Sequence, residues 1–284
     1  MEKKTINTWI TESIKYFVEE SPENILDQNY IEKAWESPLV GFSRGDDELY
    51  TFFKEDIGDF YWTPFEIFCK TYPDIIVQPQ DISVISWILP QTKSTKEEQH
   101  TDRNFPTERA VLARVNGDEF NRKIGEFIID LLLHENYKAL SPMLSPLWEN
   151  KKSVKYDYAS TWSERHTAYV CGLGTFGLSD VLITPVGSAM RCGSVIAKIN
   201  IEPTIRSYTN HNEYCLYYKN GSCMKCAERC PAKAISNKGH DKRKCREYQR
   251  NIAGKYIEQK YNIDSRYCGI CQFGVPCESG IPSE

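Results

Sequence analysis

Cysteine is the residue type whose number and spacing in this chain most clearly indicate chemistry. Eight of the eleven cysteines lie between Cys215 and Cys277, and only three lie in the first 214 residues. A disulfide framework needs an oxidising compartment, and residues 1–17 show neither an apolar signal core nor paired arginines. We therefore expect a cytoplasmic protein whose cysteines bind a metal or a cluster.

One short run of cysteines matches the iron–sulfur motif of bacterial ferredoxins. Cys223, Cys226 and Cys230 are separated by two and three residues and are followed by Pro231. The motif normally has a further cysteine three positions earlier, where this chain has an asparagine, and the nearest upstream cysteine is Cys215. The sequence therefore predicts a lengthened loop that still supplies the fourth ligand.

The eight C-terminal cysteines are enough for two complete four-cysteine sites. In two-cluster ferredoxins the fourth cysteine of each run ligates the other cluster, because the chain crosses between the two sites. The first quartet, assigned to one 4Fe-4S cluster, consists of Cys215, Cys223, Cys226 and Cys277. The second quartet, assigned to the other, consists of Cys230, Cys245, Cys268 and Cys271. Two structural zinc sites are the alternative, but the run that ends in Cys-Pro favours iron–sulfur clusters.

Length and composition indicate a soluble globular protein of two domains. The chain has 284 residues, of which 40% are hydrophobic and 26% are charged. Its net charge of −4 gives no overall basic field, so nucleic acid is expected to be an improbable partner. No stretch approaches the ~20 apolar residues that cross a membrane. We place the boundary so that residues 1–205 form one domain and residues 206–284 form a ferredoxin-like domain.

The elements that must position these cysteines follow from apolar periodicity. Helical spacing predicts helices, an apolar run that ends at Pro90 predicts a buried strand, and the aromatic stretch 52–68 is expected to form core. The polar stretch 91–103 is expected to be a loop. The predicted helices are 6–18, 120–133 and 164–171, and the predicted strands are 82–89, 181–184 and 194–201. Helices mixed with non-adjacent strands predict an α+β fold.

A glycine-rich loop, GLGTFG at residues 172–177, follows the last of these helices. It lacks the strand, helix and acidic residue of a dinucleotide-binding motif, so we do not predict a Rossmann site. Its glycines allow either the close approach of a large flat ligand or a tight turn. Both interpretations remain open at this point.

Longer segments resemble a known superfamily. SERHTAYVCGLGTFGLSDVLITPVGSAMRCGSVI, GSCMKCAERCPAKAI and YCGICQFGVPCE resemble the corrinoid-dependent epoxyqueuosine reductases and reductive dehalogenases, and the likeness extends over residues 80–277. The resemblance implies a nitroreductase-like α+β domain that binds cobalamin, followed by the two-cluster domain. The residues that it implies for cobalamin binding are Gly172, Gly174, Gly177, Leu182, Ile183, Thr184, Pro185, Gly187 and Ser188.

The resemblance also implies a proton donor. Epoxyqueuosine reductases have an aspartate six residues before the glutamate of the helix that leads into the glycine loop. Counting back from Glu164 gives Tyr158, with Asp157 beside it, and reductive dehalogenases use a tyrosine. The chain departs from the reductase pattern at residues 175–178, where Thr-Phe-Gly-Leu replaces Trp-x-Gly-Lys. It also leaves no room after Cys277 for the helical-repeat extension of many tRNA-acting members.

We therefore expect an iron–sulfur oxidoreductase that receives electrons from a ferredoxin or flavodoxin. The electrons pass through two clusters to cobalamin, which reduces an unidentified small molecule. One alternative is a protein that binds and reduces the corrinoid for a partner. Another is an epoxyqueuosine reductase that acts on tRNA. A third keeps the clusters without a corrinoid, with the glycine loop structural or binding a flavin.

Overall fold

A four-stranded antiparallel sheet forms the centre of the molecule. The computed structural model describes residues 5–30 and 32–283, so residues 1–4 and 31 of the predicted 1–205 domain and residue 284 of the predicted 206–284 domain lie outside it. The strand order is β1-β2-β8-β3. These strands are β1 (Leu39–Arg44), β2 (Ile82–Pro90), β8 (Met190–Lys198) and β3 (Ala139–Leu140).

Strand β2 is the buried strand that the apolar run predicts. All nine of its residues are buried, and it pairs with β1 on one side and with β8 on the other. Its side chains alternate between the two faces of the sheet, as the strand period of two requires. Ile85 and Trp87 pack into one hydrophobic cluster, whereas Val84 and Ile88 pack into another.

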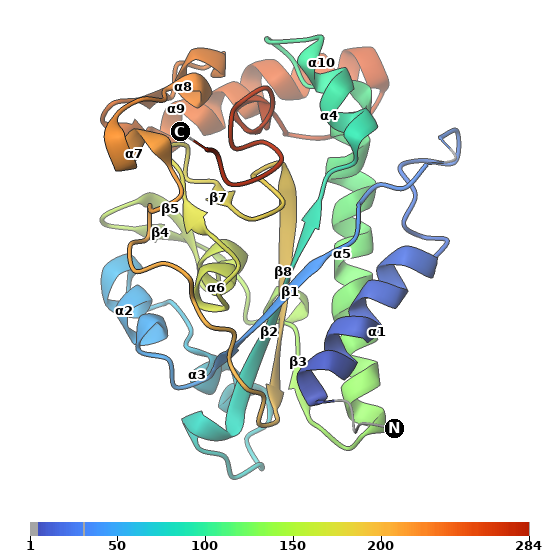
Figure 1. The fold of residues 1–284 in the computed structure, drawn as a ribbon, viewed down its shortest axis with the longest axis vertical. Coiled ribbons are helices and arrows are strands. Elements are labelled where there is room, and N and C mark those ends of the chain that lie inside the picture. The colour runs from blue at the N-terminus through green and yellow to red at the C-terminus, as the bar shows by residue number, and fades with distance from the viewer. Residues whose placement is uncertain (1–4, 31, 284) are drawn as a thin grey trace.

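Helices cover both faces of this sheet, so the main body has three layers (Figure 1). Residues of α1 (Ile6–Glu20) and α5 (Glu108–His134) share the first cluster with Ile85 and Trp87. The opposite face is covered by α2 (Glu48–Ile57), α3 (Pro64–Thr71) and α6 (Glu164–Val170). The aromatic stretch 52–68 runs from α2 into α3, and its residues Phe53, Tyr61 and Phe68 are buried, which agrees with the predicted core role.

Two of the element predictions need correction. The stretch 91–103 is not a loop, because residues Lys93–His100 form helix α4. The side chain of Thr92 caps this helix by accepting a hydrogen bond from the backbone N–H of buried Thr95. The helix predicted at 120–133 begins twelve residues earlier, at Glu108. Its first turns bury alanine and glycine against the core, and small residues give little periodic signal.

Short elements connect the layers and build the cysteine-rich end. Strands β4 (Asn150–Ser153) and β5 (Asp157–Ser160) form a hairpin, and β6 (Thr175–Phe176) pairs with β7 (Leu182–Ile183). The cysteine-rich part contains α7 (Leu216–Asn220), α8 (Lys225–Arg229), β9 (Ile235–Ser236), β10 (Gly239–His240), α9 (Lys242–Tyr248) and α10 (Gly254–Tyr261). A π-helical turn, η3 (Gln249–Ala253), joins α9 to α10. Three short 3-10 turns complete the set: η1 (Pro79–Asp81), η2 (Pro142–Leu144) and η4 (Ile270–Gln272).

The mixed arrangement of helices and small sheets confirms the predicted α+β class at this level. In the part of the chain that the structure describes, no helix combines the length and apolarity that crossing a membrane requires.

Candidate functional site

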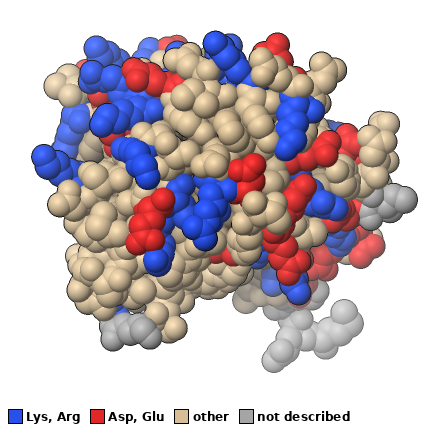
Figure 2. Space-filling view, turned by 90° about the horizontal axis from the view of Figure 1, so that it is seen from above, with Lys and Arg blue, Asp and Glu red and all other residues tan. Residues whose placement is uncertain are grey.

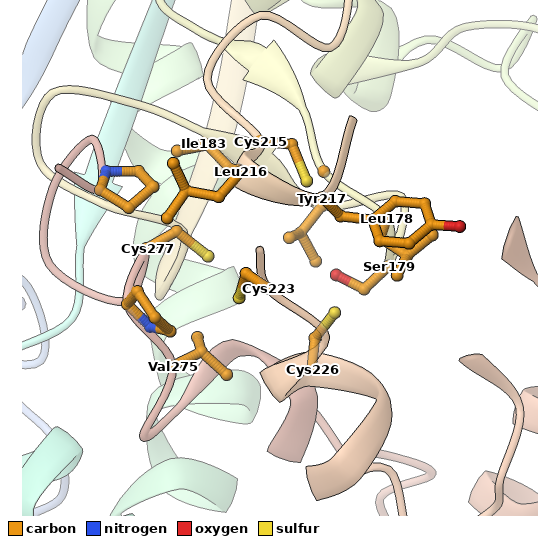
Figure 3. A pocket seen from close by; sticks show the side chains of 14 residues that line it. Leu178, Ser179, Ile183, Cys215, Leu216, Tyr217, Cys223, Cys226, Val275 and Cys277 are labelled. Carbon is orange, nitrogen blue, oxygen red and sulfur yellow. The ribbon is translucent and has the colours of Figure 1, made fainter. Parts of the chain in front are cut away.

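The first quartet surrounds one small cavity at the cysteine-rich end. Cys215 precedes α7, Cys226 belongs to α8, and Cys277 comes from the last turn of the chain. Together with Cys223 they line a cavity whose other walls are mainly apolar. Figure 3 shows the four sulfur atoms facing this shared space from separate parts of the chain. The structure therefore brings together the four residues that the crossing pattern groups.

The pKa of Cys226 also depends on the other thiols of the first quartet. Burial, together with the neighbouring Cys277, Cys215 and Cys223, raises the pKa of Cys226 to about 12. These three neighbours are the remaining members of the first quartet. The free Cys226 thiol therefore keeps its proton at neutral pH, and ligation to a cation has to displace it.

The second quartet lines a larger cavity, of about 480 Å³. Cys230 follows α8, Cys245 lies in α9, and Cys268 and Cys271 come from the loop around η4. Burial raises the pKa of Cys268 to about 12, with Cys245 and Cys230 as the charged neighbours. Burial also holds the pKa of Cys271 well above its ordinary value, and here the neighbours include Cys226 of the first quartet. The two quartets therefore lie next to each other.

The donor set of each quartet can be compared with what a cluster requires. Four cysteine thiols line each of two neighbouring cavities. Four cysteine thiolates are the ligands that hold a 4Fe-4S cluster of the ferredoxin type. The residue types present therefore fit such clusters.

Polar donors from the protein approach three of the sulfur atoms. The backbone N–H of Ala234 donates to Cys230 Sγ at 3.3 Å, and the Gln249 amide donates to Cys245 Sγ at 3.4 Å. The Ser188 hydroxyl donates to Cys277 Sγ at 3.6 Å. Such donors stabilise negative charge on sulfur and so raise the reduction potential of a bound cluster.

The larger cavity contains an acidic side chain without a partner. Glu164 begins α6, and both of its carboxyl oxygens are buried without a hydrogen bond. Burial raises the pKa of Glu164 to about 8. At neutral pH this group is therefore mostly a neutral acid that can donate a proton into the cavity. This role was not predicted from the sequence, where Glu164 was only the position from which six residues were counted back to Tyr158.

The two predicted proton donors are found elsewhere, on the β4–β5 hairpin. Tyr158 is 40% exposed, and the Arg246 guanidinium lies 4.3 Å from its ring centroid. Asp157 has a φ of +58° and pairs with Arg243 at 3.2 Å. Neither residue lines the larger cavity, although Ser160 of the same strand does. Their role as proton donors stays a prediction, which this placement does not favour.

The glycines of the predicted corrinoid loop have structural reasons of their own. A Cβ atom on Gly174 would lie 2.2 Å from the Ile183 carbonyl oxygen, and one on Gly187 would lie 2.0 Å from the Glu278 carbonyl oxygen. Gly187 also has a φ of +96°, a conformation that favours glycine. Close packing of the chain against itself therefore accounts for a glycine at both positions.

The rest of the predicted corrinoid set also lies outside the larger cavity. Gly177 and Ile183 line the smaller cavity of the first quartet. The segment reaches the larger cavity at the intervening positions Ser179 and Val181, and again at Met190. Cobalamin contact stays a prediction for Gly172, Gly174, Gly177, Leu182, Ile183, Thr184, Pro185, Gly187 and Ser188.

Comparison with known proteins gives a sequence relative of part of the chain. No family model matches. The epoxyqueuosine reductase of Lactococcus garvieae (strain Lg2) is 29% identical over 117 residues, which cover 39% of this chain. The match covers 31% of the relative, so the chain spans about a third of the length of the curated protein it matches.

Solved structures also match this chain. A catabolic reductive dehalogenase matches with a TM-score of 0.52 and 14% identity, over 86% of this chain and 30% of that chain. A selenomethionine-labelled epoxyqueuosine reductase matches with a TM-score of 0.47 and 19% identity, over 88% of this chain and 64% of that chain. At this identity the dehalogenase match shows a similar fold and nothing more.

One expectation is overturned by these comparisons. An epoxyqueuosine reductase with an epoxyqueuosine-modified tRNA-Tyr stem loop also matches, with a TM-score of 0.44 and 19% identity over 87% of this chain and 63% of that chain. The prediction that nucleic acid is an improbable partner is therefore wrong. It rested on the net charge of −4, which averages the whole surface and does not describe any single face. The chain is thus similar in sequence to an epoxyqueuosine reductase over part of its length, and similar in fold to a reductive dehalogenase.

Proposed function

We propose that the protein is an oxidoreductase that uses two 4Fe-4S clusters and a cobalamin to reduce epoxyqueuosine carried in an RNA stem loop. The sequence match to an epoxyqueuosine reductase supports this substrate over a small halogenated molecule. Reduction of the epoxide to the alkene consumes two electrons and two protons, and the epoxide oxygen leaves as water. The protein must therefore deliver both electrons and protons to one place.

The two quartets provide a path for the electrons. Soft thiolate ligands hold iron in both of its oxidation levels, and four per site complete each cluster. Cysteines of both quartets pack in one hydrophobic cluster, so the two sites are neighbours. Only the second quartet lines the larger cavity. Electrons from a low-potential donor therefore enter at the first quartet and leave from the second.

The larger cavity is the proposed place for cobalamin and substrate, within a nitroreductase-like domain. It has a volume of about 480 Å³ and is lined by the second quartet together with other polar and aromatic side chains. Trp148 Nε1 and the Glu164 carboxyl are buried polar groups without hydrogen bonds, and both residues line it. A ligand rich in amide groups satisfies such atoms. When bound, cobalamin supplies the cobalt-centred reduction of the substrate.

Glu164 is our proposal for the source of the proton. Its carboxyl group lines the same cavity as the second quartet, so proton and electrons reach one place. Tyr158 or Asp157 can serve instead only if the β4–β5 hairpin moves over the cavity. The single observation that carries the proposed function is therefore that one cavity is lined both by the four thiols of the second quartet and by the buried, protonated Glu164.

Turnover of a defined RNA tests the proposed function. The protein is purified anaerobically, reconstituted with iron, sulfide and cobalamin, and mixed with reduced flavodoxin and a stem-loop RNA that contains epoxyqueuosine. We expect a product lighter by one oxygen atom, detected by mass spectrometry of the digested RNA. Fully loaded protein that forms no product contradicts the proposal. If the bound cobalamin is nevertheless reduced, the alternative of a corrinoid-reducing protein gains support.

A further inference from the structure

We propose that RNA docks on a basic surface formed by the β4–β5 hairpin and helix α9, at the edge of the larger cavity. We call this surface, residues 150–158 and 241–250, the basic cradle. The inference rests on the proposed function, because it names the surface that holds the RNA part of the substrate. It is argued from charge, contacts and position.

The charge of the basic cradle is opposite to that of the rest of the protein. Its two segments contain eight Lys and Arg residues and three Asp and Glu residues. The other 265 residues contain 27 basic and 36 acidic ones. Figure 2 looks down on the end of the molecule that carries α9, and blue side chains gather at its upper left. A local field of this kind attracts a polyanion although the whole chain is acidic.

Contacts between hairpin and helix hold the basic cradle together. Arg243 pairs with Asp157 at 3.2 Å, and Arg246 lies over the ring of Tyr158. Lys242 lies 5.0 Å from the ring centroid of Tyr156. These pairs set cations beside two tyrosine rings, of which Tyr158 is exposed and Tyr156 is half-buried. Proteins that bind single-stranded RNA combine cations, which bind phosphates, with aromatic rings, which stack on bases.

Other cations of the basic cradle project toward solvent. Lys152 and Arg250 are exposed, and the Lys244 side chain is 63% exposed, with Asp241 4.0 Å away. A pair at that distance in solvent has little strength, so Lys244 remains available to a phosphate group. These three residues are the ones we expect to neutralise RNA phosphates.

The position of the basic cradle connects it to the chemistry. Trp148 and Ser160, at the two ends of the hairpin, line the larger cavity, and so do Cys245 and Tyr248 of α9. In Figure 1 the hairpin lies on the same side of the molecule as the labelled end of α9. A loop bound along the cradle by its phosphates is therefore placed to insert one base into the cavity.

An acidic electron donor is the other partner that a basic surface can attract. The donor has to reach the first quartet, because the second quartet is the one that borders the cavity. No residue of the hairpin or of α9 lines the cavity of the first quartet. The observations therefore favour RNA on the basic cradle and an electron donor elsewhere.

Charge reversal tests the inference without any turnover. The triple variant K152E/K244E/R250E is compared with K15E/R122E/K138E, which makes the same charge change at exposed positions of α1, α5 and the turn after α5. Binding of a fluorescent stem-loop RNA with ordinary guanine is measured by anisotropy at several salt concentrations. We expect the cradle variant to bind at least ~10-fold more weakly and to lose about two from the slope of log affinity against log salt. The control variant is expected to stay within about twofold of the wild type at equal salt.

Each outcome of this experiment has a distinct meaning. Equal loss in both triple variants, or no loss in either, overturns the basic cradle. So does a cradle variant that keeps its RNA affinity but loses electron uptake from reduced flavodoxin. Iron content and circular dichroism verify that both variants fold. If the cradle binds RNA but loaded protein never reduces epoxyqueuosine, the proposed function fails while the cradle stands.

Discussion

The backbone N–H of Ser188 donates to the carbonyl oxygen of Cys277 at 2.8 Å, and the Ser188 hydroxyl reaches the sulfur of the same residue. Ser188 follows Gly187 in the turn between β7 and β8. The last cysteine of the chain is therefore held by the larger part of the protein as well as by its own loop. This contact fixes the fourth thiol of the first quartet.

Gly187→Ala is predicted to weaken the contact that holds the Cys277 thiol in place. The new methyl group would meet the Glu278 carbonyl, and the φ of +96° is strained for alanine, so we expect a loss of more than about 1 kcal/mol. We also expect less iron to be retained by the first quartet, as measured by iron analysis after anaerobic reconstitution. Gly221→Ala is the matched control, because it has a φ of +74° but nothing within 4 Å of the added atom. Equal iron retention in both variants contradicts the proposed anchoring.

Cys226→Ser is predicted to remove one cluster and leave the other. Iron should fall from about eight to about four atoms per chain, with a matching fall in acid-labile sulfide. Cys69→Ser is the control, because Cys69 packs against the core of the main sheet, away from both quartets. A loss of all iron from Cys226→Ser would show that the two sites fill only together. Zinc in place of iron would contradict the cluster assignment.

Glu164→Gln is predicted to change how stability depends on pH. The folded carboxyl keeps its proton up to about pH 8, whereas the unfolded one ionises near its ordinary value of 4.5. Between these values the unfolded state binds fewer protons, so stability of the wild type falls as pH rises, by about 1.4 kcal/mol per unit from this group. The Gln variant has no ionisable group at this position, so its stability does not fall with pH for this reason.

Denaturation of the cofactor-free protein at pH 5 and pH 8 measures the effect. The stability of Glu164→Gln relative to the wild type should be greater at pH 8 than at pH 5. Glu126→Gln, on an exposed position of α5, controls for the loss of any carboxyl. The same relative stability at both pH values would mean that Glu164 does not hold its proton.

Turnover is predicted to require the Glu164 proton. Glu164→Gln should slow epoxide reduction by about 10²–10⁴-fold, with electron delivery to the clusters unchanged. The wild-type rate should fall as pH rises through about 8, because the donor loses its proton there. Tyr158→Phe keeps the ring that Arg246 contacts and should retain most activity. The opposite result, with Tyr158→Phe inactive and Glu164→Gln active, returns the role to the hairpin.

The cysteine sites were the most predictable part of the molecule. These cysteines follow short local spacings, and the crossing rule was sufficient to group Cys215 with Cys277, which lie 62 residues apart and line the same cavity. Strand β2 was equally clear, because a strand buried on both faces is mostly apolar. Such signals depend on few neighbours and are visible in sequence.

The missed features depend on contacts that sequence does not display. Helix α4 buries Thr95 and Gln99, so its inner face looks polar, and only its capping threonine hints at a helix. Glu164 resembles any acidic residue in a first helical turn, where a negative charge is ordinary. Its importance appears only once Trp162 and the cavity surround it. Tertiary packing decides both cases.

The order of the eight cysteines has a consequence for how the protein matures. The chain passes through one quartet, then the other, and returns to the first only at Cys277. A ribosome must therefore synthesise the chain as far as Cys271 before the second quartet is complete, and as far as Cys277 before the first is complete. Under the proposed function, either cluster can thus be completed only after all four strands of the central sheet, the last of which ends at Lys198, have been synthesised.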